Sequence, residues 1–340
     1  MIDQPQAAPA TPADPAAAAP TGRPAGTAFT LERALQSGAA LVVIYLLLLA
    51  VFFIASPVFL TGANMVNIAA SVATLGIVAA VQTAVIISGG FDLSVGSTAA
   101  LTSVVAAQLL ADGAGTPVAI VGALVVGALI GLGNALVITR LNVNPLIATL
   151  GMLSIVRGVA LVWTDALTVV YPADRLAYLG RARIAGVPVS VIFMLLTFLA
   201  VWAVLRYTVF GRFVFAVGGN RKAAFLAGVH VERVQSIVYV ASGLAAALAG
   251  LVIASQLIAG SPQAANSLEL SAVTAAVLGG ASLAGGQGRV WMTLIGALIM
   301  GTLTNGLVLM DISSFWQMTV LGVVLILAVA LDQLRTRNRG

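Results

Sequence analysis

The sequence predicts an all-α protein that crosses a membrane about ten times. Only 8% of its 340 residues are charged, 60% are hydrophobic, and the mean hydropathy is +1.09. A soluble domain carries roughly 25% charged residues. Residues 34–91 contain no Asp, Glu, Lys or Arg, which leaves room for two helices of the ~20 residues that a bilayer requires. Transmembrane β-barrels show short alternating segments instead, so this pattern indicates helices.

Ten apolar segments account for the predicted crossings. The third and eighth are the shortest and are rich in glycine, which makes them candidates for broken or re-entrant helices. GALIGLGNAL (127–136) resembles GALIMGTLTNGL (296–307), and the two would cross in opposite directions. Inverted repeats, common in transporters, would produce this likeness, and chance similarity between Gly/Ala/Leu-rich helices explains it equally well. The segments are approximately 38–59, 66–88, 95–111, 117–138, 145–164, 187–207, 235–256, 270–285, 290–310 and 314–332.

The distribution of basic residues predicts the orientation. With the N-terminus inside and ten crossings, twelve Lys and Arg residues lie on the inner side and three on the outer side, with Arg157 inside a span. Basic residues favour the cytoplasmic side, so both termini are expected there. Residues 1–33 are rich in Ala and Pro and are expected to form a disordered cytoplasmic tail. The membrane domain then covers 34–335, and 336–340 form a second cytoplasmic tail.

The composition also excludes several kinds of site. The chain has no cysteine and a single histidine, His230, so no metal site and no cofactor are expected. An intramembrane enzyme is disfavoured because the spans hold no HExxH motif and no paired catalytic acids.

The stretch SGGFDLSVGS (88–97) places one aspartate in an almost charge-free region. Gly89 and Gly90 are suited to end the second helix, because glycine readily adopts a left-handed conformation. Asp92 is suited to cap the third helix by accepting N–H groups near Val95. A second interpretation places this helix break along a translocation path. The residues assigned to the break or the path are Gly89, Gly90, Asp92, Ser94, Gly96, Gln82, Asn134 and Asn305. For the two asparagines, a hydrogen bond between helices is the simpler interpretation.

The longest basic segment on the inner side is 206–235. Gly218, Gly219 and Asn220 predict a turn or a helix start, and apolar residues at helical spacing follow up to Val234. A short amphipathic helix is therefore expected at the cytoplasmic face. It either lies on anionic lipid or docks a soluble partner. Docking is favoured slightly by small residues that permit close approach: Ala223, Ala224, Ala227 and Gly228.

AVGGNRKAAFLAGVHVERV (216–234) resembles the cytoplasmic coupling segment of ribose/xylose/galactose-type permeases of ATP-binding cassette (ABC) importers. Four further stretches resemble the same family in order along the chain, and the resemblance spans about 34–335. Two features depart from the family pattern: Phe91 replaces an expected Ile, and Arg221–Lys222 stand where an acidic residue is often found. The four stretches are SGGFDLSVGS (88–97), NPLIATLGMLSIVRGVALV (144–162), AVLGGASLAGGQGRV (276–290) and SSFWQMTVLGVVLILAV (313–329).

The resemblance implies a ten-helix, vitamin-B12-importer-like (type II) permease in the bacterial inner membrane. Two permease subunits, identical or different, would form the path for a monosaccharide. A separate ATPase would supply energy, and a periplasmic or lipid-anchored binding protein would deliver the sugar. This chain has no GxxxxGK[ST] phosphate loop, in keeping with ATP hydrolysis on another subunit. Contact with the ATPase is expected at Gly218, Gly219, Asn220, Ala223, Ala224 and Gly228.

Other functions remain open from the sequence. The cargo of such a permease is a pentose or hexose, or another small polar solute such as inositol, an autoinducer-like polyol or a nucleoside. A different class of protein, a proton-coupled secondary carrier, would use Asp92 to bind the coupling proton. Transport without any ATPase would distinguish that carrier from an importer subunit.

Overall fold

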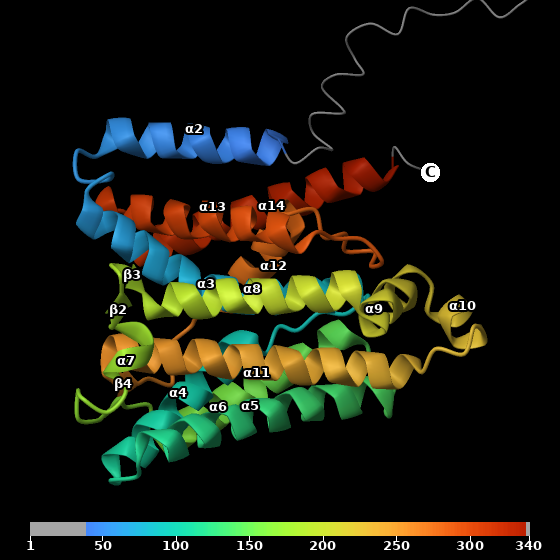
Figure 1. Ribbon diagram of the computed structural model, residues 1–340, viewed down its shortest axis with the longest axis horizontal. Helices are drawn as coiled ribbons and strands as arrows, with labels where there is room; N and C mark the ends of the chain where they lie inside the picture. The colour runs from blue at the N-terminus through green and yellow to red at the C-terminus, as the bar shows by residue number, and fades with distance from the viewer. Residues whose placement is uncertain (1–38, 338–340) are drawn as a thin grey trace, which may run out of the picture.

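The computed structural model describes residues 39–337 as a bundle of helices that run along a common axis (Figure 1). The tail expected at 1–33 and residues 338–340 lie outside the described residues. Within these described residues, six helices are long and apolar enough to cross a membrane by themselves. They are α3 (Gly62–Ile87), α5 (Thr116–Thr139), α6 (Pro145–Trp163), α8 (Val189–Tyr207), α11 (Val231–Leu257) and α13 (Val290–Leu309).

The other four predicted segments are also helical, with shorter apolar stretches. They form α2 (Ala39–Ala55), α4 (Val95–Ala111), α12 (Leu268–Leu278) and α14 (Ser314–Arg337), whose apolar part ends at Ala330. The eighth segment was expected to reach residue 285, but α12 ends at Leu278. A turn with Gly280 at φ +85° follows, and a loop then leads to α13. At about 1.5 Å per residue, α12 is only ~16 Å long, about half of a bilayer core.

Two helices form the centre of the bundle. In α3, 89% of the most apolar window is buried, and in α11 67% is buried, against 17% in α6. The outer helices therefore present apolar side chains to their surroundings, as a membrane protein requires. Ile155, Leu196 and Ile326 are examples.

The packing of the two halves of the chain is similar. In the first half, α4 packs against α5 and α6, and α5 packs against α11. In the second half, α12 packs against α13 and α14, and α13 packs against α3. Each short helix thus lies beside the next two spans of its own half, and also contacts the central helix of the other half.

The two ends of the bundle carry different structures (Figure 1). One end has a helical turn and two small antiparallel sheets, β1 with β4 and β2 with β3. The other end has α9 (Val209–Gly219) and α10 (Arg221–Leu226). Helix α2 begins, and α14 ends, toward the α9–α10 end. The elements of the first end are α7 (Ala177–Gly180), β1 (Val169–Val170), β2 (Arg183–Ile184), β3 (Val187–Pro188) and β4 (Ala259–Gly260).

The loop between α6 and α8 is tied to the bundle. The Tyr171 hydroxyl is buried and donates a hydrogen bond to the Ala254 carbonyl at 2.8 Å. Burial raises the pKa of Tyr171 to about 12, so its hydroxyl stays protonated as a donor near neutral pH. Ser255 donates to the Leu176 carbonyl and accepts the Gly180 N–H. This loop is therefore a fixed cover over the end of α11, with Asp174 and Arg175 exposed on it.

Candidate functional site

Asp92 lies in the connection between α3 and α4, and its carboxylate accepts hydrogen bonds from residues at the start of α4, on α5 and on α11. Its Oδ1 accepts hydrogen bonds from the Ser94 N–H (2.9 Å), the Ser94 hydroxyl (2.6 Å) and the Asn134 amide (3.4 Å). Its Oδ2 accepts from the Ser242 hydroxyl of α11 at 2.7 Å. Asp92, Ser94, Asn134 and Ser242 are all buried. The carboxylate is thus held entirely by neutral donors, and it connects the start of α4 to α5 and α11.

The structure confirms the left-handed glycine expected in this stretch but corrects the capping role of Asp92, because the N-cap of α4 is Ser94 and no side chain caps this helix. Gly89 has φ +80° just after the end of α3, the left-handed conformation that the sequence predicts. Asp92 accepts the N–H of Ser94, rather than an N–H near Val95. Neighbouring contacts stiffen the break, because the Tyr239 hydroxyl donates to the Phe91 carbonyl and leaves no space for a side chain at Gly90. Sequence reasoning missed Tyr239 and Ser242, which lie about 150 residues away.

The other polar residues assigned to a path lie inside the subunit. Gln82 is fully buried, and neither of its amide atoms has a hydrogen-bond partner among the described residues. Asn134 donates to the Ser94 hydroxyl at 2.8 Å. Asn305 exchanges two hydrogen bonds of 3.0 Å with Asn64 of α3. The geometry therefore favours helix–helix hydrogen bonds for both Asn134 and Asn305.

Four glycines from three segments of the chain meet at the end of α3. A Cβ atom built on Gly218, in the last turn of α9, would overlap the carbonyl oxygen of Ile87. Gly286 donates its N–H to that same oxygen at 2.8 Å, and a Cβ on Gly285 would lie 3.1 Å from the Cα of Gly89. We call Gly89, Gly218, Gly285 and Gly286 the glycine junction. Gly218, expected in the coupling surface, therefore packs against the bundle, while Gly219 beside it is exposed.

The coupling segment forms a short helix and a turn rather than one amphipathic helix. Asn220 caps α10 by accepting the Ala223 N–H at 2.9 Å. The helix ends at Leu226, and Gly228 has φ +84°, which a larger residue adopts only with strain. A Cβ on Gly228 would meet nothing within 4 Å. The turn thus requires glycine at Gly228, a structural reason that the sequence pattern did not show.

The residues of α10 that are exposed differ from those expected to contact a partner. Ala224 is buried in the core, whereas Ala223 is exposed. Phe225 and Leu226 are 68% and 76% exposed, although both are large and apolar. Neither is among the residues expected from the sequence to contact the ATPase. Exposed apolar side chains together on a short helix are typical of a site that contacts another molecule.

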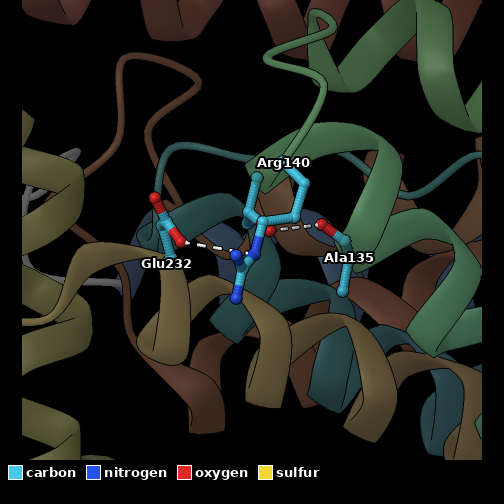
Figure 2. A network of polar contacts seen from close by, with 4 residues as sticks. Ala135, Arg140 and Glu232 are labelled. Carbon is cyan, nitrogen blue, oxygen red and sulfur yellow. Dashed lines mark hydrogen bonds and ion pairs between the residues drawn. The ribbon is translucent and has the colours of Figure 1, made fainter.

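A groove of about 1150 Å³ runs beside α10, between the end of α5 and the start of α11. Arg140 and Glu232 face each other there, with 3.6 Å between the Arg140 Nε and a Glu232 carboxylate oxygen (Figure 2). The close-up also shows Ala135, whose carbonyl accepts a hydrogen bond from Thr139 at 2.7 Å. Both members of the ion pair are more than half exposed, so the pair adds little stability. The charged lining is mainly basic: Arg140, Arg221, Lys222, Arg233 and the single acid Glu232.

Comparisons with known proteins cover most of the chain. Residues 64–329 match the family described as branched-chain amino acid transport system / permease component. A ribose import permease protein of Bacillus subtilis is 42% identical over 84% of this chain and 90% of its own length. The ribose import permease protein of Escherichia coli K12 is 43% identical, over 84% and 91%. An L-arabinose ABC transporter permease protein of Azospirillum brasilense is 36% identical over 88% of each chain. No solved structure matched. The chain therefore belongs to the family of branched-chain amino acid transport system permease components, and it is similar over most of its length to these sugar permeases.

Proposed function

We propose that this protein is the membrane permease subunit of an ABC importer and forms the path for a monosaccharide across the bacterial inner membrane. The observation that carries the proposal is the similarity, over more than four fifths of the chain, to permeases named for ribose, L-arabinose and D-allose. Sugars share a dense set of hydroxyl groups, and all three relatives are named for one. A sugar is therefore favoured over inositol, a nucleoside or another polar solute.

The proposed topology has ten crossings, with both termini in the cytoplasm. It is supported by the ten helices at the predicted segments and by α2 and α14, whose described ends lie toward the same end of the bundle (Figure 1). The matching contacts of α4 and α12 support inverted repeats and a type II permease fold. In this arrangement α9 and α10 face the cytoplasm, and α7 with the small sheets faces outward.

A labelling experiment tests the orientation. The chain has no cysteine, so single cysteines report position directly. Cysteine in place of Ala223 should be protected from an impermeant maleimide in intact cells and should react after lysis, because α10 is cytoplasmic. Cysteine in place of Asp174 should react in intact cells. Both positions are exposed, so access to the thiol is matched. Labelling of the Ala223 variant in intact cells would overturn this topology.

We further propose that α10 and the adjoining groove dock the ATPase. Phe225 and Leu226 supply exposed apolar contacts, and the basic lining attracts acidic side chains. Lipid is a weaker candidate, because the closely spaced apolar and basic residues line a groove rather than one flat helix face. The partner ATPase is expected to place acidic residues opposite Arg221 and Lys222. A second permease subunit and a binding protein complete the importer.

The docking proposal makes a specific prediction. Phe225→Ser should leave the permease folded, because the side chain is 68% exposed, and should reduce copurification of the ATPase about tenfold or more. Leu167→Ser, at an equally exposed side chain on the outer loop, is the matched control and should leave the complex intact. Equal ATPase recovery from both variants would place the docking surface elsewhere.

Reconstitution tests the function itself. The permease, its ATPase and its binding protein should be placed in liposomes, and uptake of labelled ribose, arabinose and allose measured with and without ATP. ATP-dependent uptake of one of them is expected. Uptake that follows a pH gradient without the ATPase would support the secondary carrier, and uptake of a non-sugar alone would correct the substrate class.

A further inference from the structure

A polar segment without helical structure reaches deep into the bundle between β4 and α12. Its sequence is SPQAANS (261–267). Just before the segment, a Cβ on Gly260 would touch Ser103 and Ala107 of α4. Just after the segment, the Glu269 carboxylate lies against Gly96, in the first turn of α4. A side chain at position 96 would overlap this carboxylate. The segment therefore descends along α4 from the level of Ser103 to that of Gly96.

The length of α4 shows how far residues 261–267 reach into the membrane. Gly96 is fifteen residues from Ala111, the end of α4, which corresponds to roughly 22 Å at 1.5 Å per residue. The hydrocarbon core of a bilayer is about 30 Å thick. Glu269 and the end of the polar segment thus lie well inside the membrane, although the sequence alone places these residues in an outer connection.

The segment is open on one side of the subunit. Gln263 and Asn266 are exposed, and Ser261, Ser267 and Glu269 are half-exposed. Ala265 and Ser267 have positive φ values of 57° and 63°, so the backbone here is irregular. Irregular backbone at membrane depth occurs where protein covers it or where it lines a water-filled cavity. Polar side chains at that depth likewise face a cavity or the inside of an assembly.

Arg157 of α6 holds this segment in place. Its Nη1 donates hydrogen bonds to the carbonyls of Pro262 at 2.6 Å and Ala264 at 3.0 Å. These bonds satisfy two carbonyls that no helix supplies with donors. The Arg157 side chain is half-buried. Its two hydrogen bonds within the described part of the chain both come from Nη1. The remaining guanidinium donors have no hydrogen-bond partner among residues 39–337, so they can bind water or a ligand.

We propose that residues 261–269, together with Arg157, form a water-lined wall along which the sugar crosses the middle of the membrane, facing the same wall of a second copy of this chain. The proposal rests on the function proposed above. In a single subunit these polar residues are exposed, so in a monomer they would contact the hydrocarbon of the membrane. A second copy is needed to cover them and enclose the path. Gln82, Asn134 and Asp92, by contrast, are buried within one subunit and do not reach this surface.

The chemistry of the wall matches a sugar. Each sugar hydroxyl both donates and accepts a hydrogen bond, and the side-chain amides of Gln263 and Asn266 offer both functions. Arg157, at the edge of the same wall, supplies further donors. A wall of mixed donors and acceptors suits a neutral polyhydroxylated solute better than an ion.

Thiol reactivity in a lipid nanodisc tests whether water reaches the wall. Gln263→Cys and Asn266→Cys should react with a charged methanethiosulfonate reagent about tenfold or more faster than Leu196→Cys or Ile155→Cys, because the reacting thiolate forms only in water. Leu196 and Ile155 are apolar, lie within spans and are 54% and 62% exposed, so they are controls matched in exposure. Equal, slow rates at all four positions would refute the water-lined wall.

Sugar uptake by the reconstituted importer separates this inference from the proposed function. Asn266→Ala should lower the uptake of the transported sugar about fivefold through the loss of a hydrogen bond, with the complex still assembled. Leu196→Ala should leave uptake unchanged. An importer that transports sugar while cysteines at 263 and 266 stay unreactive would refute the wall and leave the function standing. Reactive cysteines in a complex that transports none of the tested sugars would refute the function and retain the wall.

Discussion

Replacing Gly218 with alanine should strongly destabilise the permease, whereas the same change at Gly219 should have little effect. The new Cβ at Gly218 would overlap the Ile87 carbonyl oxygen and lie 2.7 Å from the Gly286 nitrogen, both of which belong to the backbone. Backbone atoms move only with their whole segment, so overpacking here should cost at least about 1–3 kcal/mol. A Cβ on Gly219 meets nothing within 4 Å, which makes Gly219→Ala a matched control.

Thermal denaturation of the purified permease in detergent measures this difference. A clear drop in the melting temperature is expected for Gly218→Ala and none for Gly219→Ala. The same variants should then be assayed for ATPase association. If Gly218→Ala melted like the wild type but failed to bind the ATPase, Gly218 would belong to the docking surface that the sequence predicted rather than to the glycine junction.

Local signals in the sequence predicted local structure well. The ten apolar segments are helical because side chains in lipid must be apolar and the backbone must satisfy its own hydrogen bonds. Gly89 adopts the left-handed conformation, and Asp92 accepts an N–H at the entry to α4. Both roles depend on residues within a few positions along the chain, so their pattern could be read directly.

Roles that depend on distant residues could not be read in the same way. Position 218 requires glycine because its Cα packs against Ile87 and Gly286, which are 131 and 68 residues away. A glycine pair beside a basic segment of the sequence gives no sign of this contact. Gly228 is needed for a turn, yet in the sequence it continues the spacing of an amphipathic helix. The depth of residues 261–267 follows from their contacts with α4, whereas their composition is that of an ordinary outer loop.

The second large effect is expected at Asp92. Replacement with leucine would leave the Ser94 N–H and the hydroxyls of Ser94 and Ser242 without their acceptor in a fully buried place, and Asn134 would lose one of its two acceptors. Each unsatisfied buried group costs about 1–3 kcal/mol. The sum is comparable to the total stability of many proteins. Asp92→Leu should therefore abolish assembly, seen as loss of the monodisperse peak in size-exclusion chromatography.

Asp92→Asn distinguishes the structural role of this carboxylate from a role for its charge. An asparagine oxygen in place of Oδ1 can accept the same three hydrogen bonds. Its NH₂ group replaces Oδ2, and the Ser242 hydroxyl can respond by accepting instead of donating, since a hydroxyl does both. The variant should assemble and keep ATP-dependent sugar uptake within about threefold of the wild type, a change of less than 1 kcal/mol. A secondary carrier that uses Asp92 to bind a proton would lose coupled transport completely in this variant. An assembled but inactive Asp92→Asn complex would therefore refute the structural role and revive the proton-coupled carrier.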